Sequence, residues 1–378
     1  MHARCGRSVR PRTLAAVALL LLGHALLTGT AQGQQQDGRA RSGAELYQEA
    51  CAACHRSDGT GQQQSLVGFS VPLPDFTDCS FATREPDADW VAVAHQGGPV
   101  RGFSPLMPAF GEALTEDELF RIMGHVRTMC TDDEWPRGEL NLPRTFFTEK
   151  AYPEDEAVLT TGFTVTGSAA ISNDLVYEKR LGPRNQLELK LPIDAARRAD
   201  DTWAGGAGDI AIGFKRAVSH SLERGRIFAV TGEFILPTGD EAAGLSAGTT
   251  IFEPFVSFGQ ILRGDSFLQA QAGVELPFTS RAEREAFWRV AAGRTFTEGP
   301  WGRAWSPMIE ILAARELSSG QRVHWDLVPQ VQFTLNTRQH VMANVGVRVP
   351  VNARSGRQTQ VLVYLLWDWF DGGLFDGW

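Results

Sequence analysis

The chain has 378 residues, of which 43% are hydrophobic and 21% charged, and its formal net charge is −8 at pH 7. This composition predicts a folded protein rather than a disordered one, and the length favours two domains over a single core. The acidic balance comes without any basic run, so the sequence argues against a nucleic-acid partner.

The N-terminal segment has the three parts of a secretory signal peptide. A positive region precedes the apolar run TLAAVALLLLGHALL, and the small residues of TGTAQG follow it. The apolar run is short for a membrane helix, and an uncleaved anchor is the alternative. We therefore expect residues 1–33 to be removed, the protein to be exported, and its cysteines to meet an oxidising compartment.

The stretch ELYQEACAACHRSDGTG contains a C-x-x-C-H pattern formed by Cys51, Cys54 and His55. One helical turn places two thiols where they can bond to the two vinyl groups of one porphyrin, and the pattern is typical of c-type haem attachment. The adjacent imidazole then becomes the proximal iron ligand. A zinc site would need two more ligands at similar spacing, and a thioredoxin-like pair would need a βαβ context. The sequence therefore predicts one covalent haem c.

The flanks of this motif agree with it. Ser42 is predicted to cap a helix that runs through GAELYQEACAAC. The turn after His55 contains Gly59 and Gly61, which allow positive φ close to a macrocycle.

Met107 is the candidate for the second axial ligand. It lies in a loop between Pro105 and Pro108, where neither neighbour continues a helix. The rival ligands are two methionines and two histidines, of which Met123 fits a helix core better and Met129 a helix end. The full set of rivals is Met123, Met129, His95 and His125.

A helix is predicted after the Met107 loop. Thr115 and Glu118 form a capping box at its start. The residues that follow at helical spacing give it one apolar face, made of Leu119, Ile122, Met123 and Val126.

From Ser42 to Cys130 the pattern, with its MPAF and LTEDEL segments, resembles a class I monohaem cytochrome c. The resemblance implies a small all-α fold over residues 40–131. It also implies that Cys51 and Cys54 are the covalent sites, with His55 and Met107 as the iron ligands. A His/Met pair favours a relatively high potential and a closed coordination sphere, and therefore electron transfer more than enzyme catalysis. His125 departs mildly from the family, which often has an aromatic residue there.

Cys79 and Cys130 are left over from the haem motif. In an exported protein an even leftover pair predicts a disulfide, and two buried thiols are the alternative.

Residues 132–157 are predicted to form a linker between two domains. The segment mixes prolines with acidic residues and has no clean period, which is typical of a semi-extended connection. Scattered apolar residues indicate that it packs on something, namely Leu140, Leu142, Phe146 and Phe147.

From residue 158 to residue 378 the hydrophobic period changes to two, as in QLELKL, FLQAQAGVEL and HVMANVGVRV. About twelve such stretches are separated alternately by short turns and longer Gly-rich loops, which predicts an antiparallel transmembrane β-barrel. Lipid offers no partner to an open strand edge, so the sheet must close. A soluble β-sandwich is the alternative. The segments GAGDIAIGFKRAV and EFILPTGD resemble outer-membrane transporter barrels.

Aromatic and charged residues complete the barrel prediction. Tryptophans near strand ends suit an interfacial girdle, and a terminal aromatic is usual in bacterial barrels; these are Trp288, Trp305, Trp325, Trp367, Trp369 and Trp378. Charged residues at the polar phase are expected to line a solvated interior without selectivity, namely Glu233, Glu253, Glu275, Glu310, Lys215, Arg289 and Arg348. A twelve-strand barrel is narrow enough to be filled by side chains or by part of the linker.

These patterns together predict an outer-membrane-anchored c-type cytochrome with its haem domain in the periplasm. Its expected partners are periplasmic redox proteins and outer-membrane lipid. Two alternatives stay open: a porin–cytochrome conduit that oxidises an extracellular donor such as Fe(II), and a solute transporter with a redox regulatory domain.

Overall fold

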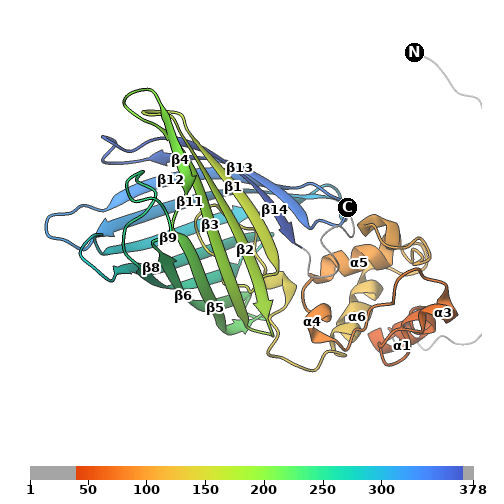
Figure 1. Cartoon of the computed structure of the whole chain (residues 1–378). Coiled ribbons are helices and arrows are strands. Elements are labelled where there is room, and N and C mark those ends of the chain that lie inside the picture. Colours follow the sequence, from red (N-terminus) through yellow and green to blue (C-terminus); the bar gives the residue numbers. More distant parts are fainter. Residues whose placement is uncertain (1–39, 369–378) are drawn as a thin grey trace, which may run out of the picture. The chain divides into compact units, whose positions relative to one another are not determined.

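A computed structural model of the chain describes residues 40–368. The predicted signal peptide, Trp369 and Trp378 lie outside the described residues. From Arg41 onward the described chain belongs to one compact unit. Its helices are α1 (Gly43–Ala50), α2 (Ala52–His55), α3 (Gln64–Val67), α4 (Cys79–Ala82), α5 (Asp87–Gln96) and α6 (Glu116–Arg127), with 3₁₀ turns η1 (Gly98–Arg101) and η2 (Gly138–Leu140) (Figure 1).

None of the helices in residues 40–368 combines the length and the apolar character that a bilayer crossing requires.

Helices α1 and α6 begin where the sequence predicts, each at a complete capping box. The Ser42 side chain accepts a hydrogen bond from the backbone N–H of Glu45 at 3.2 Å, and Thr115 does the same for Glu118 at 3.3 Å. The helices cross at Gly43, where a Cβ atom would lie 2.0 Å from the carbonyl oxygen of Arg121. Only a glycine permits so close an approach of two backbones.

The buried face of α6 is the predicted one. Its four members are 1–5% exposed and pack with Leu46, Tyr47 and Val91 in a single apolar core. Met123 therefore belongs to the core of this domain, as its helical spacing indicates.

The helix predicted through GAELYQEACAAC is interrupted once. Helix α1 ends at Ala50 and α2 starts at Ala52, while Cys51 between them has φ −116° and ψ −32°. The backbone N–H of His55 still bonds to the carbonyl of Cys51 at 2.9 Å. The break therefore leaves the helical turn of the motif intact.

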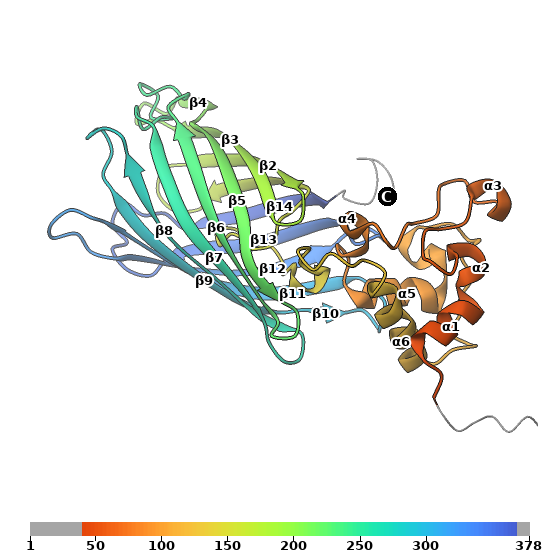
Figure 2. The same ribbon diagram turned by 90° about the horizontal axis from the view of Figure 1, so that it is seen from below.

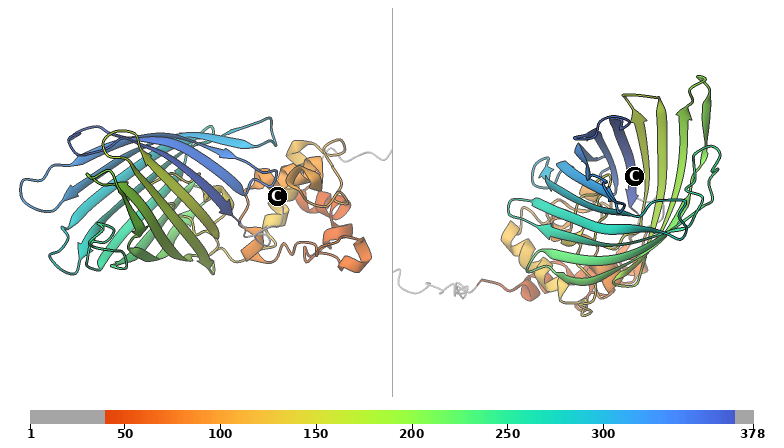
Figure 3. Two further views of the ribbon diagram at one scale, coloured as in Figure 1. Left: turned by 45° about the horizontal axis from the view of Figure 1, so that its top comes forward. Right: turned by 90° about the vertical axis from the view of Figure 1, so that its left-hand side faces the viewer.

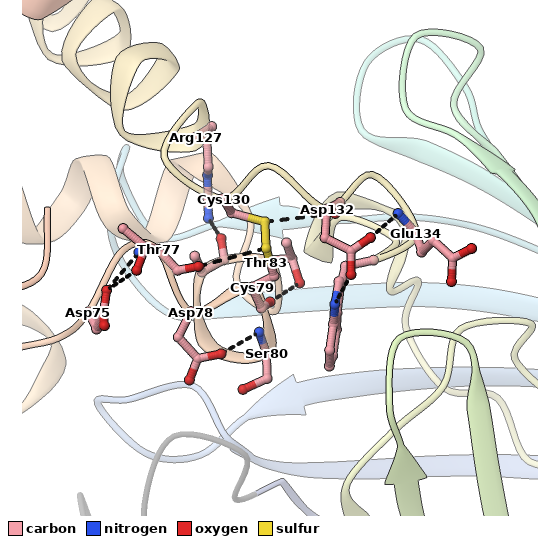
Figure 4. Close-up of a disulfide and its surroundings, with 12 residues drawn as sticks. Asp75, Thr77, Asp78, Cys79, Ser80, Thr83, Arg127, Cys130, Asp132 and Glu134 are labelled. Carbon is pink, nitrogen blue, oxygen red and sulfur yellow. Dashed lines mark hydrogen bonds between the residues drawn. A yellow bond between two sulfur atoms is a disulfide. The ribbon is translucent and has the colours of Figure 1, made fainter. Parts of the chain in front are cut away.

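A disulfide joins Cys79 to Cys130, with the two Cα atoms 5.1 Å apart (Figure 4). Cys79 is the first residue of α4, which Asp78 caps by accepting the N–H of Ser80 at 2.9 Å. Cys130 follows the end of α6, so the bond connects the two helix ends across a separation of 51 residues. Arg127 strengthens the same junction by donating to the carbonyls of Ala82 and Glu85.

The rest of the described chain forms one antiparallel sheet that closes on itself (Figures 2 and 3). The first strand pairs with the last from Glu156–Asp368 to Thr164–Gln360. Two short strands, β4 and β10, extend the ends of β5 and β9, so the ring itself has the predicted twelve strands. The strands are β1 (Glu156–Thr164), β2 (Ala170–Leu181), β3 (Asn185–Arg197), β4 (Trp203–Ala207), β5 (Ile210–Ser221), β6 (Arg226–Leu236), β7 (Ile251–Ile261), β8 (Ser266–Pro277), β9 (Glu285–Arg294), β10 (Phe296–Thr297), β11 (Ala304–Glu316), β12 (His324–Thr334), β13 (Val341–Pro350) and β14 (Gln360–Asp368).

The polarity of the barrel is inverted relative to a soluble protein. Large apolar side chains point outward and are about 40–50% exposed, among them Phe163, Leu187, Phe214, Ile311 and Val363. Polar and charged side chains point inward and are buried, among them Glu178, Gln186, Lys215, Gln269 and Glu310. A soluble β-sandwich would bury its apolar face instead. This arrangement is the one that a barrel needs to span a bilayer.

Four of the predicted aromatic positions lie within the described residues, near the two ends of the barrel. Trp288 and Trp325 form an edge-to-face pair with ring centroids 5.8 Å apart. Trp305 stacks on Phe296 at 4.6 Å near the start of β11, and Trp367 pairs with Ala157 at the start of β1. These positions suit interfacial anchors.

The linker does pack on something, namely the inner wall of the barrel. Leu140 packs with Tyr152 and Ala217, and Leu142 packs with Phe267 and Met308. The strand that follows begins at Glu156, inside the predicted linker range.

Candidate haem site

The C-x-x-C-H motif begins at Cys51, which separates α1 from α2, and its other four residues form the single turn of α2. The Cys54 N–H donates to the carbonyl of Cys51 at 3.2 Å, so the two thiols leave the same turn. Both cysteines are unbonded and half-buried. Burial and the neighbouring Cys54 raise the pKa of Cys51 to about 11, so its sulfur is a protonated thiol at neutral pH.

His55 is buried, with 8% of its surface exposed, and its ring stacks on Phe76 at a centroid distance of 4.9 Å. Burial lowers the pKa of His55 to about 4, so the imidazole is neutral at pH 7. A neutral imidazole is the form that binds a metal. The Nδ1 atom has no hydrogen-bond partner among the described residues.

The chain turns away after His55 as the sequence predicts. Gly59 and Gly61 both have positive φ, at 78° and 76°. A Cβ atom on Gly59 would lie 2.2 Å from the sulfur of Met129. Met129, one of the rival ligands, therefore packs beside this turn and against the domain core.

Met107 lies in a loop whose backbone is fixed by hydrogen bonds. Its carbonyl accepts the Gly98 N–H and its own N–H donates to Ser104, both at 3.1 Å. The loop returns to α5 through a bond from the Phe110 N–H to the carbonyl of Ala94 at 2.9 Å. The Met107 side chain is half-buried, and its role as distal ligand stays a prediction.

The two histidine rivals have contacts of their own. The His125 ring meets Tyr47 edge-on at 5.4 Å, at the crossing of α1 and α6. The ring therefore packs where these two helices meet. The His95 ring packs at 5.5 Å from Trp301.

The structure adds a residue that the sequence reasoning missed. Trp301 belongs to the turn between β10 and β11, is 7% exposed, and joins the apolar core of the helical domain. Its carbonyl accepts a hydrogen bond from Arg101 at 2.8 Å, and Arg101 also pairs with Asp89 at 2.7 Å. No local signal marks this tryptophan, because its partners are about 200 residues earlier in the chain.

The donor set fits a covalent haem. Two free thiols stand on one turn, and the next residue supplies a buried imidazole whose Nδ1 is unpartnered among the described residues. Bound haem would supply a one-electron Fe(III)/Fe(II) couple. Cys51 and Cys54 would hold the group, and His55 would ligate its iron.

Comparison with protein families agrees with this site. Residues 38–126 match the model of the family described as cytochrome C oxidase, cbb3-type, subunit III. A search of curated proteins finds no match.

Among solved structures, the chain is similar to an outer membrane channel from Pseudomonas putida F1, with 11% identity and a TM-score of 0.42 over 60% of this chain and 99% of that one. It is also similar to the NanC porin, with 8% identity and a TM-score of 0.40 over 56% and 98%. The chain is similar as well to the KdgM porin in complex with disordered oligogalacturonate. Their sequence identity is 7% and the TM-score is 0.38, over 57% of this chain and 99% of that one. At these identities the similarity concerns the fold alone, and the ligands of those proteins are not transferred to this chain.

The fold and the site define a two-part protein: a helical haem-binding module followed by a closed barrel with a lipid-facing surface. Its N-terminal part is a cytochrome c domain, and its C-terminal part is a twelve-stranded β-barrel that resembles porins and outer membrane channels.

Proposed function

We propose that this protein is an outer-membrane-anchored c-type cytochrome that transfers one electron at a time on the periplasmic side. The observation that carries the proposal is the single turn bearing Cys51, Cys54 and His55, on a cytochrome c domain joined to a barrel with an apolar exterior. The motif attaches the haem, and the barrel holds it at the membrane.

Different residues would attach the haem, ligate its iron and exclude water. Cys51 and Cys54 would hold the haem through thioether bonds, so that it would not dissociate. His55 and Met107 would ligate its iron, and such a ligand pair would favour electron transfer over oxygen or peroxide activation. Phe76 and the surrounding apolar core exclude water from the His55 ring. The proposed partners are periplasmic redox proteins, with export directed by the signal peptide.

Membrane fractionation with haem staining tests this proposal. Full-length protein should stain for haem after denaturing electrophoresis, because thioether bonds survive it, and the stain should follow outer-membrane fractions. The variant Cys54→Ala should keep the membrane location and lose most of the stain. Stain that stays in the soluble periplasm, or unstained wild-type protein, contradicts the proposal.

A further inference from the structure

The linker of residues 132–157, called the connector below, is enclosed from Trp135 onward. From Trp135 to Val158 no residue is exposed, although the four residues before Trp135 all are. Thr145, Thr148 and Tyr152 are each 2% exposed. A segment with so little regular structure reaches such burial only when other elements surround it. The helical domain contacts residues 137–139, and the barrel wall contacts the residues that follow.

Glu310 on β11 holds the centre of this segment. Its carboxylate, which is fully buried, accepts the backbone N–H groups of Phe146, Phe147 and Thr148 at 3.1, 3.2 and 2.7 Å. The Thr148 hydroxyl donates to it at 2.8 Å, and Gln330 donates at 2.6 Å. Charge-assisted hydrogen bonds of this kind are the strong ones in a protein interior.

Other strands around the ring hold the rest of the connector. Each contact joins the connector to an inward side chain of a different part of the wall. The Glu154 N–H donates to Gln186 on β3 at 2.7 Å, Gln269 on β8 donates to Pro143 at 2.8 Å, Arg289 on β9 donates to Phe147 at 2.7 Å, and Tyr364 on β14 donates to Arg144 at 2.7 Å. The connector is therefore fixed to the wall from several directions.

Buried ion pairs add to these bonds. Arg144 pairs with Glu156 and, at 2.7 Å, with Glu178 on β2. Lys215 on β5 faces Glu149 at 3.6 Å. Removing the connector would leave Glu178 and Lys215 without these partners inside the barrel, a change that is strongly destabilising for buried charges.

The wall is also shaped to receive the connector. Gly346 on β13 faces Phe146, and a Cβ atom there would lie 2.7 Å from the phenyl ring. Phe147 packs with Leu312, Val328 and Leu362. Apolar side chains thus fill space between the polar contacts, where water would otherwise pass.

From this arrangement we propose that residues 140–155 are a resident plug that closes the barrel to solutes, and that Glu310 is the residue that holds it in place. The barrel is then a sealed anchor, and it becomes a channel only when the plug is dislodged. The proposal concerns the barrel and does not rest on the haem.

Conductance across planar lipid bilayers tests the plug. Four full-length proteins are compared: wild type, Glu310→Ala, a variant in which residues 141–149 are replaced by a Gly/Ser stretch of equal length, and Glu275→Ala. Glu275 is the matched control, since it lies on the inward phase of β8 and makes none of the plug contacts described above. Heat-dependent migration on electrophoresis verifies that each barrel is folded.

Wild type and Glu275→Ala should be closed, while the folded Gly/Ser variant should show stable open steps. Glu310→Ala should raise the open probability at least about tenfold, since it removes charge-assisted bonds. In Glu310→Ala, trypsin should cut after Arg144 or Lys150, which are protected in wild type, and release an N-terminal fragment that is identified by its mass.

Steady conductance of the wild type would overturn the plug, as would a folded Gly/Ser variant that stays closed. If Glu310→Ala matches wild type in both conductance and trypsin resistance, Glu310 is not the residue that holds the segment.

Discussion

Glu118 and Glu310 each accept backbone hydrogen bonds, but the first lies near the surface and the second is buried. Glu118 lies at the start of α6 and accepts the N–H of its cap residue Thr115 at 3.0 Å. Glu310 is fully buried and accepts three successive backbone N–H groups of the connector. The first organises one helix end in contact with water, and the second organises a segment that water does not reach.

Met107 is the predicted distal ligand of the haem iron. Met107→Ala should abolish the weak near-infrared band of a methionine–Fe(III) bond, because no other thioether is placed in the Pro-bounded loop. Met129→Ala is the matched control and should keep the band, although its sulfur lies beside Gly59. Absorption spectra of the oxidised proteins give the answer. If the band is lost in the Met129 variant instead, the two assignments must be exchanged.

The capping box of α6 predicts a pH dependence. Hydrogen bonds from the Thr115 backbone and from Arg41 lower the pKa of Glu118 to about 2, from 4.5 in an unstructured chain. A carboxyl whose pKa falls on folding stabilises the fold above its unfolded pKa, and this contribution is lost as the pH falls toward the folded pKa.

Glu118→Gln should therefore be less stable than wild type at pH 7, and the difference should vanish between about pH 4.5 and pH 2. Urea unfolding of the haem domain, followed by haem absorbance, measures this. Glu116→Gln serves as the control, because Glu116 lies two residues earlier in the first turn of α6 and outside the capping box. A difference between wild type and Glu118→Gln that persists at pH 2 would show that charge is not the cause.

At the scale of elements, the stability of the helical domain depends on contacts that connect the ends of its helices. The disulfide ties the first residue of α4 to the end of α6, and Arg127 on α6 lies over the Trp90 ring of α5 at 4.2 Å. Short helices such as α4, with four residues, are not stable alone and need such contacts.

Removing the disulfide should destabilise this domain without displacing the barrel. For a loop with a separation of 51 residues, the chain-entropy model gives a loss of about 4 kcal/mol for Cys79→Ala/Cys130→Ala. Denaturant unfolding followed by haem absorbance gives the value. In the wild-type protein both cysteines should resist alkylation until a reductant is added, and ready labelling of the native protein would contradict the bond in solution.

At the scale of the whole molecule, the inverted polarity of the barrel decides where lipid lies. Ile311, near the middle of β11, points outward and is 45% exposed, whereas its neighbour Glu310 points inward and is fully buried. One strand thus carries a lipid-facing and a lumen-facing surface in alternate residues.

Ile311→Arg should destabilise the barrel by about 2–4 kcal/mol, which is the range for arginine on the lipid face near the bilayer midplane. Leu317→Arg is the control, because Leu317 is exposed but follows the end of β11. Denaturant unfolding in lipid vesicles compares the two. Equal stability of both variants would mean that Ile311 does not face hydrocarbon.

Much of this architecture is local or periodic, and so the sequence alone predicts it. The predicted helix caps at Ser42 and Thr115 are confirmed. They could be predicted because each cap involves residues only three positions apart in the sequence. Period-two alternation predicts strands with one lipid-facing and one inward-facing surface, and such a sheet closes into a ring because lipid offers no partner to an open strand edge. The C-x-x-C-H motif fixes its own geometry within one turn.

The tertiary structure decided what depends on distant partners. Thr148 and Glu310 are 162 residues apart, and Arg101 and Trp301 are 200 apart, so no sequence window contains both members of either pair. The linker carried a composition that indicates packing, but its place in the lumen is set by the inward side chains of strands that follow it. Residues close together in the sequence determine which helices and strands form. Closure of the barrel determines which distant residues come within hydrogen-bonding distance of a buried charge such as Glu310.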